Sequence, residues 1–214
     1  MKKISECSTE DLKGKRVLVR FDLNVPVIEG EVLGTDADRI RKSMPTLDFL
    51  KSSGAQVIII SHIGRDPKET LAPVASYMGI PLLSLSAFDA SRAGSNPVVM
   101  LENLRSSKGE EENDPAFAEM LASWGDLYVN DGFSVSHRAH ASVVGVPRLL
   151  PSYAGIQMGL EMENLERALN PDHPALLVMG GAKFETKLPV ITKLLPLVDH
   201  VFVGGALANN FFKE

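Results

Sequence analysis

Short apolar runs alternate with longer helix-like stretches along the whole chain. Each apolar run is continuous and is bounded by turn residues, which is typical of strands buried on both faces of a parallel sheet. The predicted strands span residues 17–20, 56–61, 98–101, 126–130, 176–179 and 200–203. This pattern indicates a fold built around buried parallel strands.

The stretches between these runs carry helical patterns. In the first of them, Ile40, Met44 and Leu47 recur at the spacing of one helix face. Pro115 suits the first position of a later helix. The alternation predicts an α/β fold: a Rossmann-like parallel sheet with helices on both faces, followed by the beginning of a second α/β domain. The predicted helices span residues 39–53, 71–78, 115–124, 160–169 and 188–195.

A change in composition divides the chain. Two prolines in the segment NPDHP, residues 170–174, end one helical stretch and start a new segment. We predict an N-terminal α/β domain at residues 1–157, a connecting hinge helix at 158–171 and an incomplete start of a C-terminal domain at 172–214. The roughly 40 residues after the junction are too few for an independent domain. We therefore expect the chain to be the first part of a longer protein.

Composition and charge narrow the functional classes. The chain of 214 residues is 44% hydrophobic, which is normal for a protein with a packed core. Its formal net charge of −5 argues against a nucleic-acid or membrane-surface protein, since both normally carry a basic face. No apolar run approaches the roughly 20 residues of a membrane span, and the first residues lack the apolar stretch of a signal peptide. We therefore expect a cytoplasmic protein that binds neither nucleic acid nor membranes.

Polar and basic side chains follow four of the predicted strands, at the point where each strand ends. The carboxyl ends of parallel strands meet at one edge of a sheet, where open α/β sheets bind ligands. Arginine forks match the oxygens of carboxylates and phosphates, so the sequence predicts a site for a small, strongly anionic molecule. Gly64, which lies between His62 and Arg65 in the sequence, allows a ligand to approach closely. The strand-end residues of this predicted site are Arg20, Asp22, Asn24, His62, Gly64, Arg65, Arg105, Asp131, His137, Arg138 and His140.

Local explanations compete with this prediction at several positions. Asp22 and Asn24 also suit a turn before a proline. Arg20 is equally well explained as a structural partner of Asp22. Arg39 opens a helix after the acidic segment TDAD and looks locally like a capping ion pair. The charge run GEEEND, residues 109–114, is interpreted as a solvated loop.

A second candidate site lies in the segment MGGAKFETK, residues 179–187. A strand that ends in Gly-Gly lets backbone amides approach phosphate oxygens, although Gly-Gly is also common in tight structural turns. Lys183 and Lys187 share one face of a helix that begins here. The segment is neither a P-loop nor a GxGxxG fingerprint. No His, Cys and carboxylate cluster has metal-site spacing, and the single cysteine, Cys7, is interpreted as incidental.

Several segments, taken in order, resemble the phosphoglycerate kinase family. They cover nearly the whole chain, and a linked series of this kind is highly specific. The matching segments are GKRVLVRFDLNVPV, DADRIRKSMPTLDFL, SHIGR, LENLR, YVNDGFSVSHRAHASVVGV, GGAKFETK and VFVGGALANNF. The chain departs from the family at NDGFSVSHR, where N-D-A-F-G-T-A-H-R is usual.

The resemblance implies an N-terminal domain that binds 3-phosphoglycerate or 1,3-bisphosphoglycerate and a C-terminal domain that binds ADP or ATP with Mg²⁺. It implies a monomeric phosphotransferase of glycolysis and gluconeogenesis, with a carboxyl group as the acceptor. It implies catalytic roles for Arg39 and Lys183. The implied substrate-binding residues are Asp22, Asn24, Arg39, His62, Gly64, Arg65, Arg105 and Arg138. The implied nucleotide-binding residues are Gly180, Gly181, Lys183, Lys187, Gly204 and Gly205.

The family's sequences are much longer than this chain, and their later nucleotide-site motifs are absent from it. The resemblance therefore predicts that the chain alone binds the substrate and is inactive in phosphoryl transfer. A non-catalytic module that binds phosphorylated metabolites is the alternative interpretation. Lys183 and Lys187 argue against this alternative, since a pure binder need not keep them.

Overall fold

The computed structural model describes residues 2–86, 97–181 and 184–210. The chain forms two compact units, Met1–Leu160 (unit 1) and Glu161–Glu214 (unit 2). The domain ranges expected from the sequence, with a separate hinge helix at 158–171, stay a prediction.

Unit 1 is built on a six-stranded sheet in which every strand pairing is parallel. The strand order is β3-β4-β2-β1-β5-β6, so the first strand lies in the middle. The strands are β1 Arg16–Arg20, β2 Gln56–Ile60, β3 Leu82–Leu83, β4 Val98–Leu101, β5 Leu127–Asn130 and β6 Ser152–Ala154. The predicted parallel α/β fold is confirmed.

The pairing register aligns the carboxyl ends of the three central strands. Arg20, the last residue of β1, lies opposite Ile60 of β2 and opposite Asn130 of β5. The chain segments that leave these strands therefore begin at the same edge of the sheet. This edge is where polar side chains gather.

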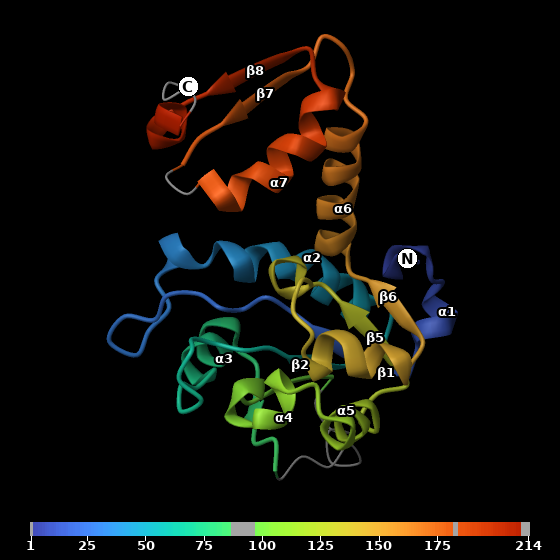
Figure 1. Ribbon diagram of the computed structural model, residues 1–214. Coiled ribbons are helices and arrows are strands. Elements are labelled where there is room, and N and C mark those ends of the chain that lie inside the picture. The colour runs from blue at the N-terminus through green and yellow to red at the C-terminus, as the bar shows by residue number, and fades with distance from the viewer. Residues whose placement is uncertain (1, 87–96, 182–183, 211–214) are drawn as a thin grey trace. The chain divides into compact units, whose positions relative to one another are not determined.

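Helices cover both faces of the sheet (Figure 1). On β1, Val17 and Val19 face one core cluster, which the apolar side of α2 completes. Leu18 faces the other cluster, to which α5 contributes. Because successive side chains of a strand point to opposite faces, a strand covered on both sides must be apolar throughout. The helices are α1 Thr9–Leu12, α2 Asp38–Ser52, α3 Ala72–Met78, α4 Lys108–Glu111, α5 Pro115–Ala122, α6 Ile156–Leu169 and α7 Phe184–Leu194.

The sequence pattern located the six longer strands and missed β3 and β6. These two strands have only two and three residues, too few to show a pattern. The helix predicted at 160–169 begins earlier, at Ile156. Its first amides donate to side chains from other elements: Ile156 N to Thr46 Oγ1 at 2.9 Å and Met158 N to Asp131 Oδ1 at 2.9 Å. Capping from a distance satisfies the free amides of the first turn.

The interpretation of residues 109–114 as a solvated loop is wrong. This segment contains most of helix α4, and the side chain of Glu110 lies in the interior with 1% exposure. Its carboxylate accepts hydrogen bonds from the backbone and the hydroxyl of Ser142. A partner distant in the sequence thus makes burial of this one charge possible.

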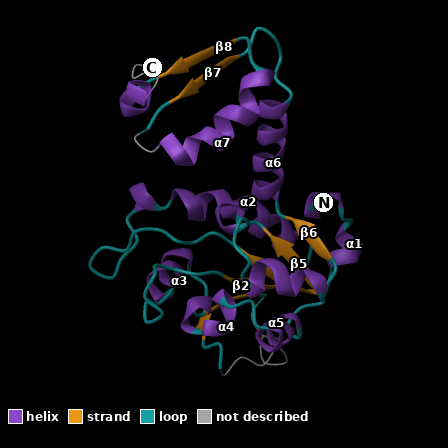
Figure 2. Cartoon of the chain, in the orientation of Figure 1, coloured by secondary structure: helices purple, strands orange, loops and turns teal. Residues whose placement is uncertain are grey.

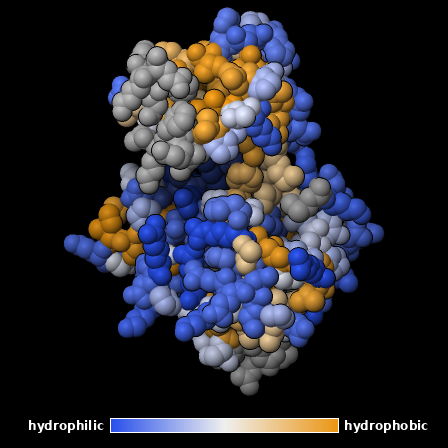
Figure 3. All heavy atoms as spheres, in the orientation of Figure 1, coloured by the Kyte–Doolittle hydropathy of each residue, from blue (hydrophilic) through white to orange (hydrophobic). Residues whose placement is uncertain are grey.

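Unit 2 contains strands β7 Leu176–Met179 and β8 His200–Val203, which pair in parallel, and helix α7 beside them (Figure 2). Leu176, Val178 and Phe202 on these strands are each at least 60% exposed. Apolar atoms accordingly gather on the visible surface of unit 2 (Figure 3). Among the described residues, no helix combines the length and apolar character needed to cross a membrane.

Shortening a core side chain of the central strand should destabilise unit 1. Leu18 is fully buried beside Trp124, the only tryptophan of the chain, in one core cluster. We expect Leu18→Ala to lower the free energy of unfolding by about 2–5 kcal/mol, because the lost contacts leave a cavity. Urea unfolding followed by Trp124 fluorescence measures this change. Leu149→Ala, at an exposed position, should stay within about 0.5 kcal/mol of the unaltered protein, and equal effects would contradict this view of the core.

Candidate anion-binding site

A cleft of about 630 Å³ opens at the carboxyl edge of the unit 1 sheet. The segments that follow β1, β2, β4 and β5 all contribute to its walls. Its lining residues are Asn24, His62, Gly64, Arg65, Arg105, Glu111 and Arg138. The structure therefore brings together residues separated by more than a hundred positions, as the strand-end pattern predicted. We call this cavity the basic cleft.

Asp22 and Arg39 pair with each other. Nη1 of Arg39 donates to both carboxylate oxygens of Asp22 at 3.0 Å, and the hydroxyl of Ser134 donates to Asp22 Oδ2 at 2.5 Å. The local interpretation of Arg39 as a cap of its own helix is wrong, since its partner belongs to the segment after β1. The Arg39 side chain is 48% exposed, so this ion pair adds little stability and leaves the guanidinium accessible to a ligand.

Gly64 has a backbone conformation that suits glycine. Its φ is +61°, and a Cβ at this position would lie 1.8 Å from an oxygen of Glu69. That oxygen accepts the backbone amides of Arg65 and Asp66, while the amide of Gly64 itself donates to Asn24 Oδ1 at 2.9 Å. The close neighbour that requires glycine is thus a carboxylate of the chain, which fixes the turn carrying Arg65.

Asn103 is a site residue that the sequence did not reveal. Its buried amide group accepts from the backbone of Ile63 and Arg105 and donates to the carbonyls of Ile63 and Glu69. One side chain therefore ties the segment after β4 to the segment after β2. The only signal in the sequence is its place between a predicted strand and Arg105.

Arg105 is the most deeply buried arginine on the wall of the basic cleft. Its Nη1 donates to the carbonyl of Gly64 at 2.5 Å. Its Nε lies 3.2 Å from a Glu111 oxygen without making a hydrogen bond. Burial, and then the charge of Arg138, lower the pKa of Arg105 below its ordinary value. Arg65 and Arg138 are exposed, so the cleft presents one buried and two exposed guanidinium groups to an anion.

His62 lines the basic cleft but is only 3% exposed. Arg20 lies behind it, with Nη2 at 3.0 Å from Nδ1 of His62. The interpretation of Arg20 as a partner of Asp22 is wrong, because its guanidinium contacts His62, Ser61, Ser142 and the Phe21 carbonyl. Burial, and then the charges of the nearby arginines, lower the pKa of His62 to about 2.

The Gly-Gly turns of unit 2 lie next to each other. Gly180 and Gly181 follow β7, and Gly204 and Gly205 follow β8. A Cβ on Gly180 would contact the Gly204 carbonyl at 3.5 Å, and one on Gly205 would contact the Gly181 amide nitrogen at 3.6 Å. The predicted position of Lys183 lies outside the described residues. Lys187 lies within α7, but the description does not extend to its side chain.

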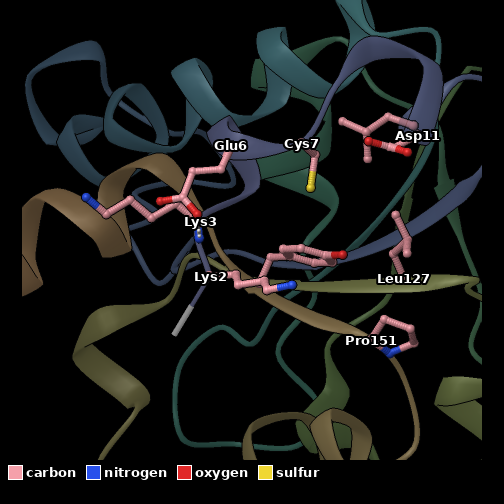
Figure 4. A pocket seen from close by; sticks show the side chains of 9 residues that line it. Lys2, Lys3, Glu6, Cys7, Asp11, Leu127 and Pro151 are labelled. Carbon is pink, nitrogen blue, oxygen red and sulfur yellow. Dashed lines mark hydrogen bonds between the residues drawn. The ribbon is translucent and has the colours of Figure 1, made fainter.

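A second cavity, of about 500 Å³, lies elsewhere in unit 1. Its walls carry Lys2 and Lys3 as well as Glu6 and Asp11 (Figure 4). Charges of both signs give it no preference for an anion, in contrast to the basic cleft. Across the described part of the chain, no group of three or more His, Cys, Asp or Glu residues is arranged to hold a metal ion.

The low pKa of His62 predicts an acid-sensitive stability. A histidine in the unfolded chain titrates near 6.5, whereas folded His62 stays neutral down to about pH 2. The unfolded state therefore binds the extra proton between these values, and the free energy of unfolding falls as the pH drops below about 6.5. The slope from this group is at most about 1.4 kcal/mol per pH unit.

The slope is measured by urea unfolding at several pH values between about 7.5 and about 5, the range in which an ordinary histidine titrates. We expect His62→Asn to flatten the dependence, because it removes the titrating group. His137→Asn, at an exposed position of unit 1, is the matched control and should keep the slope. Identical slopes in the unaltered protein and in His62→Asn would contradict the prediction.

Comparison with known proteins shows the family of this chain. The family model described as phosphoglycerate kinase matches residues 7–214. The phosphoglycerate kinase of Mesorhizobium japonicum is 45% identical over 218 residues, covering 94% of this chain and 54% of that protein. The one from Thermus thermophilus is 45% identical over 219 residues, covering 95% and 56%. The chain thus spans about half the length of the curated relatives it matches.

Solved structures show the same similarity. The structure of phosphoglycerate kinase from Coxiella burnetii superposes with a TM-score of 0.86 at 35% identity, covering 99% of this chain and 56% of that one. The enzyme from Pyrococcus horikoshii gives a TM-score of 0.85 at 30% identity, covering 100% and 57%. A family match that extends from residue 7 to the last residue is decisive: the chain belongs to the phosphoglycerate kinase family.

Proposed function

We propose that the protein to which this chain belongs transfers a phosphoryl group reversibly between 1,3-bisphosphoglycerate and ADP, giving 3-phosphoglycerate and ATP. The observation that carries the proposal is the convergence of Arg65, Arg105 and Arg138 with His62 on one cleft. In a chain with a net charge of −5, such a concentration of positive charge suits a small polyanion. We further propose that this enzyme is monomeric and cytoplasmic and acts in glycolysis.

The basic cleft suits the two ends of 3-phosphoglycerate. The arginines and His62 offer N–H donors to a phosphate or carboxylate, and arginine forks bind such oxygens in pairs. Asp22 and Asn24, which lie at the end of β1, offer oxygen acceptors for a hydroxyl group of the glycerate. We assign Gly64 to the turn that presents Arg65, because its conformation shapes that turn.

The chemistry needs charge neutralisation more than proton transfer. The carboxylate of 3-phosphoglycerate is already a nucleophile, so the proposed reaction has no general base. Catalysis then comes from in-line positioning and from cations near the moving phosphoryl group. We assign this role to Arg39 and Lys183. The exposure of the Arg39 side chain supports its part of the assignment.

The nucleotide is assigned to the Gly-Gly turns of unit 2. Gly180, Gly181, Gly204 and Gly205 lack side chains, so phosphate oxygens can approach the backbone of these turns closely, while the Gly204 amide itself donates to the Met179 carbonyl at 2.8 Å. Lys187 is assigned to the nucleotide phosphates. Mg²⁺ would arrive with the nucleotide and neutralise phosphate charge, but the described residues offer no cluster that holds it.

Calorimetric titration with 3-phosphoglycerate tests the substrate half of the proposal. We expect Arg65→Ala to weaken binding roughly 10- to 100-fold, the effect of losing a charged hydrogen-bond pair of about 1.5–3 kcal/mol. Arg148→Ala removes an exposed arginine that does not line the basic cleft and should leave the affinity unchanged. Equal affinities for all three proteins would place the substrate elsewhere.

Steady-state transfer from ATP to 3-phosphoglycerate, assayed on the whole protein to which this chain belongs, tests the catalytic half. We expect Lys183→Ala to lower kcat by roughly 10²–10³, as for the loss of one group that stabilises transition-state charge. Lys193→Ala, at an exposed position of helix α7, is the control and should keep kcat. Substrate binding without any transfer in the unaltered protein would favour the non-catalytic binding module instead.

A further inference from the structure

We propose that Arg20 is a positioning residue that holds His62 in its neutral Nε2–H tautomer, so that His62 presents a hydrogen-bond donor and not a cation to the anion in the basic cleft. The identity of that anion rests on the proposed function. The state of His62 itself does not, because it follows from contacts inside unit 1.

The tautomer follows from the contact between Arg20 and His62. Nη2 of Arg20 lies 3.0 Å from Nδ1 of His62. A guanidinium carries only N–H donors and does not lose its proton in proteins, so Arg20 must donate and Nδ1 must accept. A proton on Nδ1 would place two donors against each other. The one proton of the neutral ring is therefore on Nε2.

Arg20 cannot turn away from this contact without losing others. Its Nε donates to Ser142 Oγ at 3.1 Å, and its Nη1 donates to the Phe21 carbonyl at 2.8 Å and to Ser61 Oγ at 3.3 Å. The residue is 1% exposed, so water cannot replace these partners. An unsatisfied charged donor in the interior is costly, which keeps the guanidinium in one orientation.

Glu110 supplies the opposite charge for Arg20 through a shared partner. Its two carboxylate oxygens accept from the hydroxyl of Ser142 at 2.5 Å and from the Ser142 amide at 3.0 Å. Burial raises the pKa of Glu110, but a hydrogen bond from His140, the charge of Arg20 and the bonds from Ser142 together bring it below its ordinary value. Ser142 thus links a buried carboxylate to the guanidinium that faces His62.

The other charged groups around His62 also oppose its protonation. Arg20 comes from β1, Arg105 from the segment after β4, and Arg138 and His140 from the segment after β5, and all four act against a positive imidazole. The nearby carboxylates have other partners: Glu110 is bonded to Ser142, and Glu111 lies beside Arg105. The ring therefore stays neutral across the physiological range.

The arginines and His62 contribute to anion binding in different ways. The arginines of the basic cleft supply the positive charge, and a neutral His62 supplies a directed N–H. Phosphate monoesters and carboxylates, which are rich in acceptor oxygens, suit such a donor. An ordinary histidine would gain a charge near pH 6.5 and bind anions more tightly in acid. The arrangement seen here removes that dependence.

Nitrogen NMR of the ¹⁵N-histidine-labelled chain without ligand tests the tautomer directly. The chain has five histidines, and His62→Gln identifies the His62 signals by their loss. We expect His62 to show a protonated Nε2 and an unprotonated Nδ1, unchanged between pH 8 and pH 5.5. Titration near pH 6.5 or a protonated Nδ1 would overturn the proposal. This measurement needs neither substrate nor any Arg20 variant. Its result therefore does not depend on whether the proposed function is correct.

A second measurement tests the role of Arg20. Arg20→Met removes the donor that faces Nδ1 of His62, so the neutral ring should then populate both the Nδ1–H and the Nε2–H tautomer in the nitrogen spectrum. Arg20→Lys keeps a charged donor and should restore the Nε2–H tautomer. Arg148→Met is the surface control. A His62 that keeps only the Nε2–H tautomer in a folded Arg20→Met protein would show that Arg20 is not what positions it.

Discussion

The candidate site depends on one constraint: β1 pairs in parallel with β2 on one side and with β5 on the other. This double pairing aligns Arg20, Ile60 and Asn130 at one edge, so three chain segments start from neighbouring points. Every strand between two helical layers must be apolar, and polar residues can follow only where the strand ends. The basic cleft is the result of that geometry, since its arginines come from segments that lie far apart in the sequence.

Concentrating arginines has a cost that the surrounding structure offsets. Burial, and then repulsion from Arg138, lower the pKa of Arg105, and a buried charge without partners is destabilising. Two carboxylates and an amide balance this: Glu111 on the cleft wall beside Arg105, Glu110 linked to Arg20 through Ser142, and Asn103 between two segments. The groups that face a ligand are therefore held by neighbouring polar side chains, of which Glu110 and Asn103 are buried behind the cleft.

The two units differ in how far their strands are buried. In unit 1 the strands are covered on both faces, and the buried residues form two core clusters. In unit 2 the strands keep apolar residues exposed, among them Val178 and Phe202. The Gly-Gly turns at the ends of β7 and β8 nevertheless lie together, because the parallel pairing of two strands is enough to align their carboxyl ends.

The sequence by itself determined the longer strands, the parallel α/β class and the residues at the strand ends, because a continuous apolar run followed by polar residues is a local pattern. It did not reveal which side chains meet. Arg20 was equally compatible with Asp22 as a partner, and only the position of β1 between β2 and β5 gives it His62 and Ser142 instead. Glu110 looked solvated for the same reason. Its burial depends on Ser142, 32 residues away. Strand order and the partners of buried charges are decided by contacts between distant segments, which local periodicity does not encode.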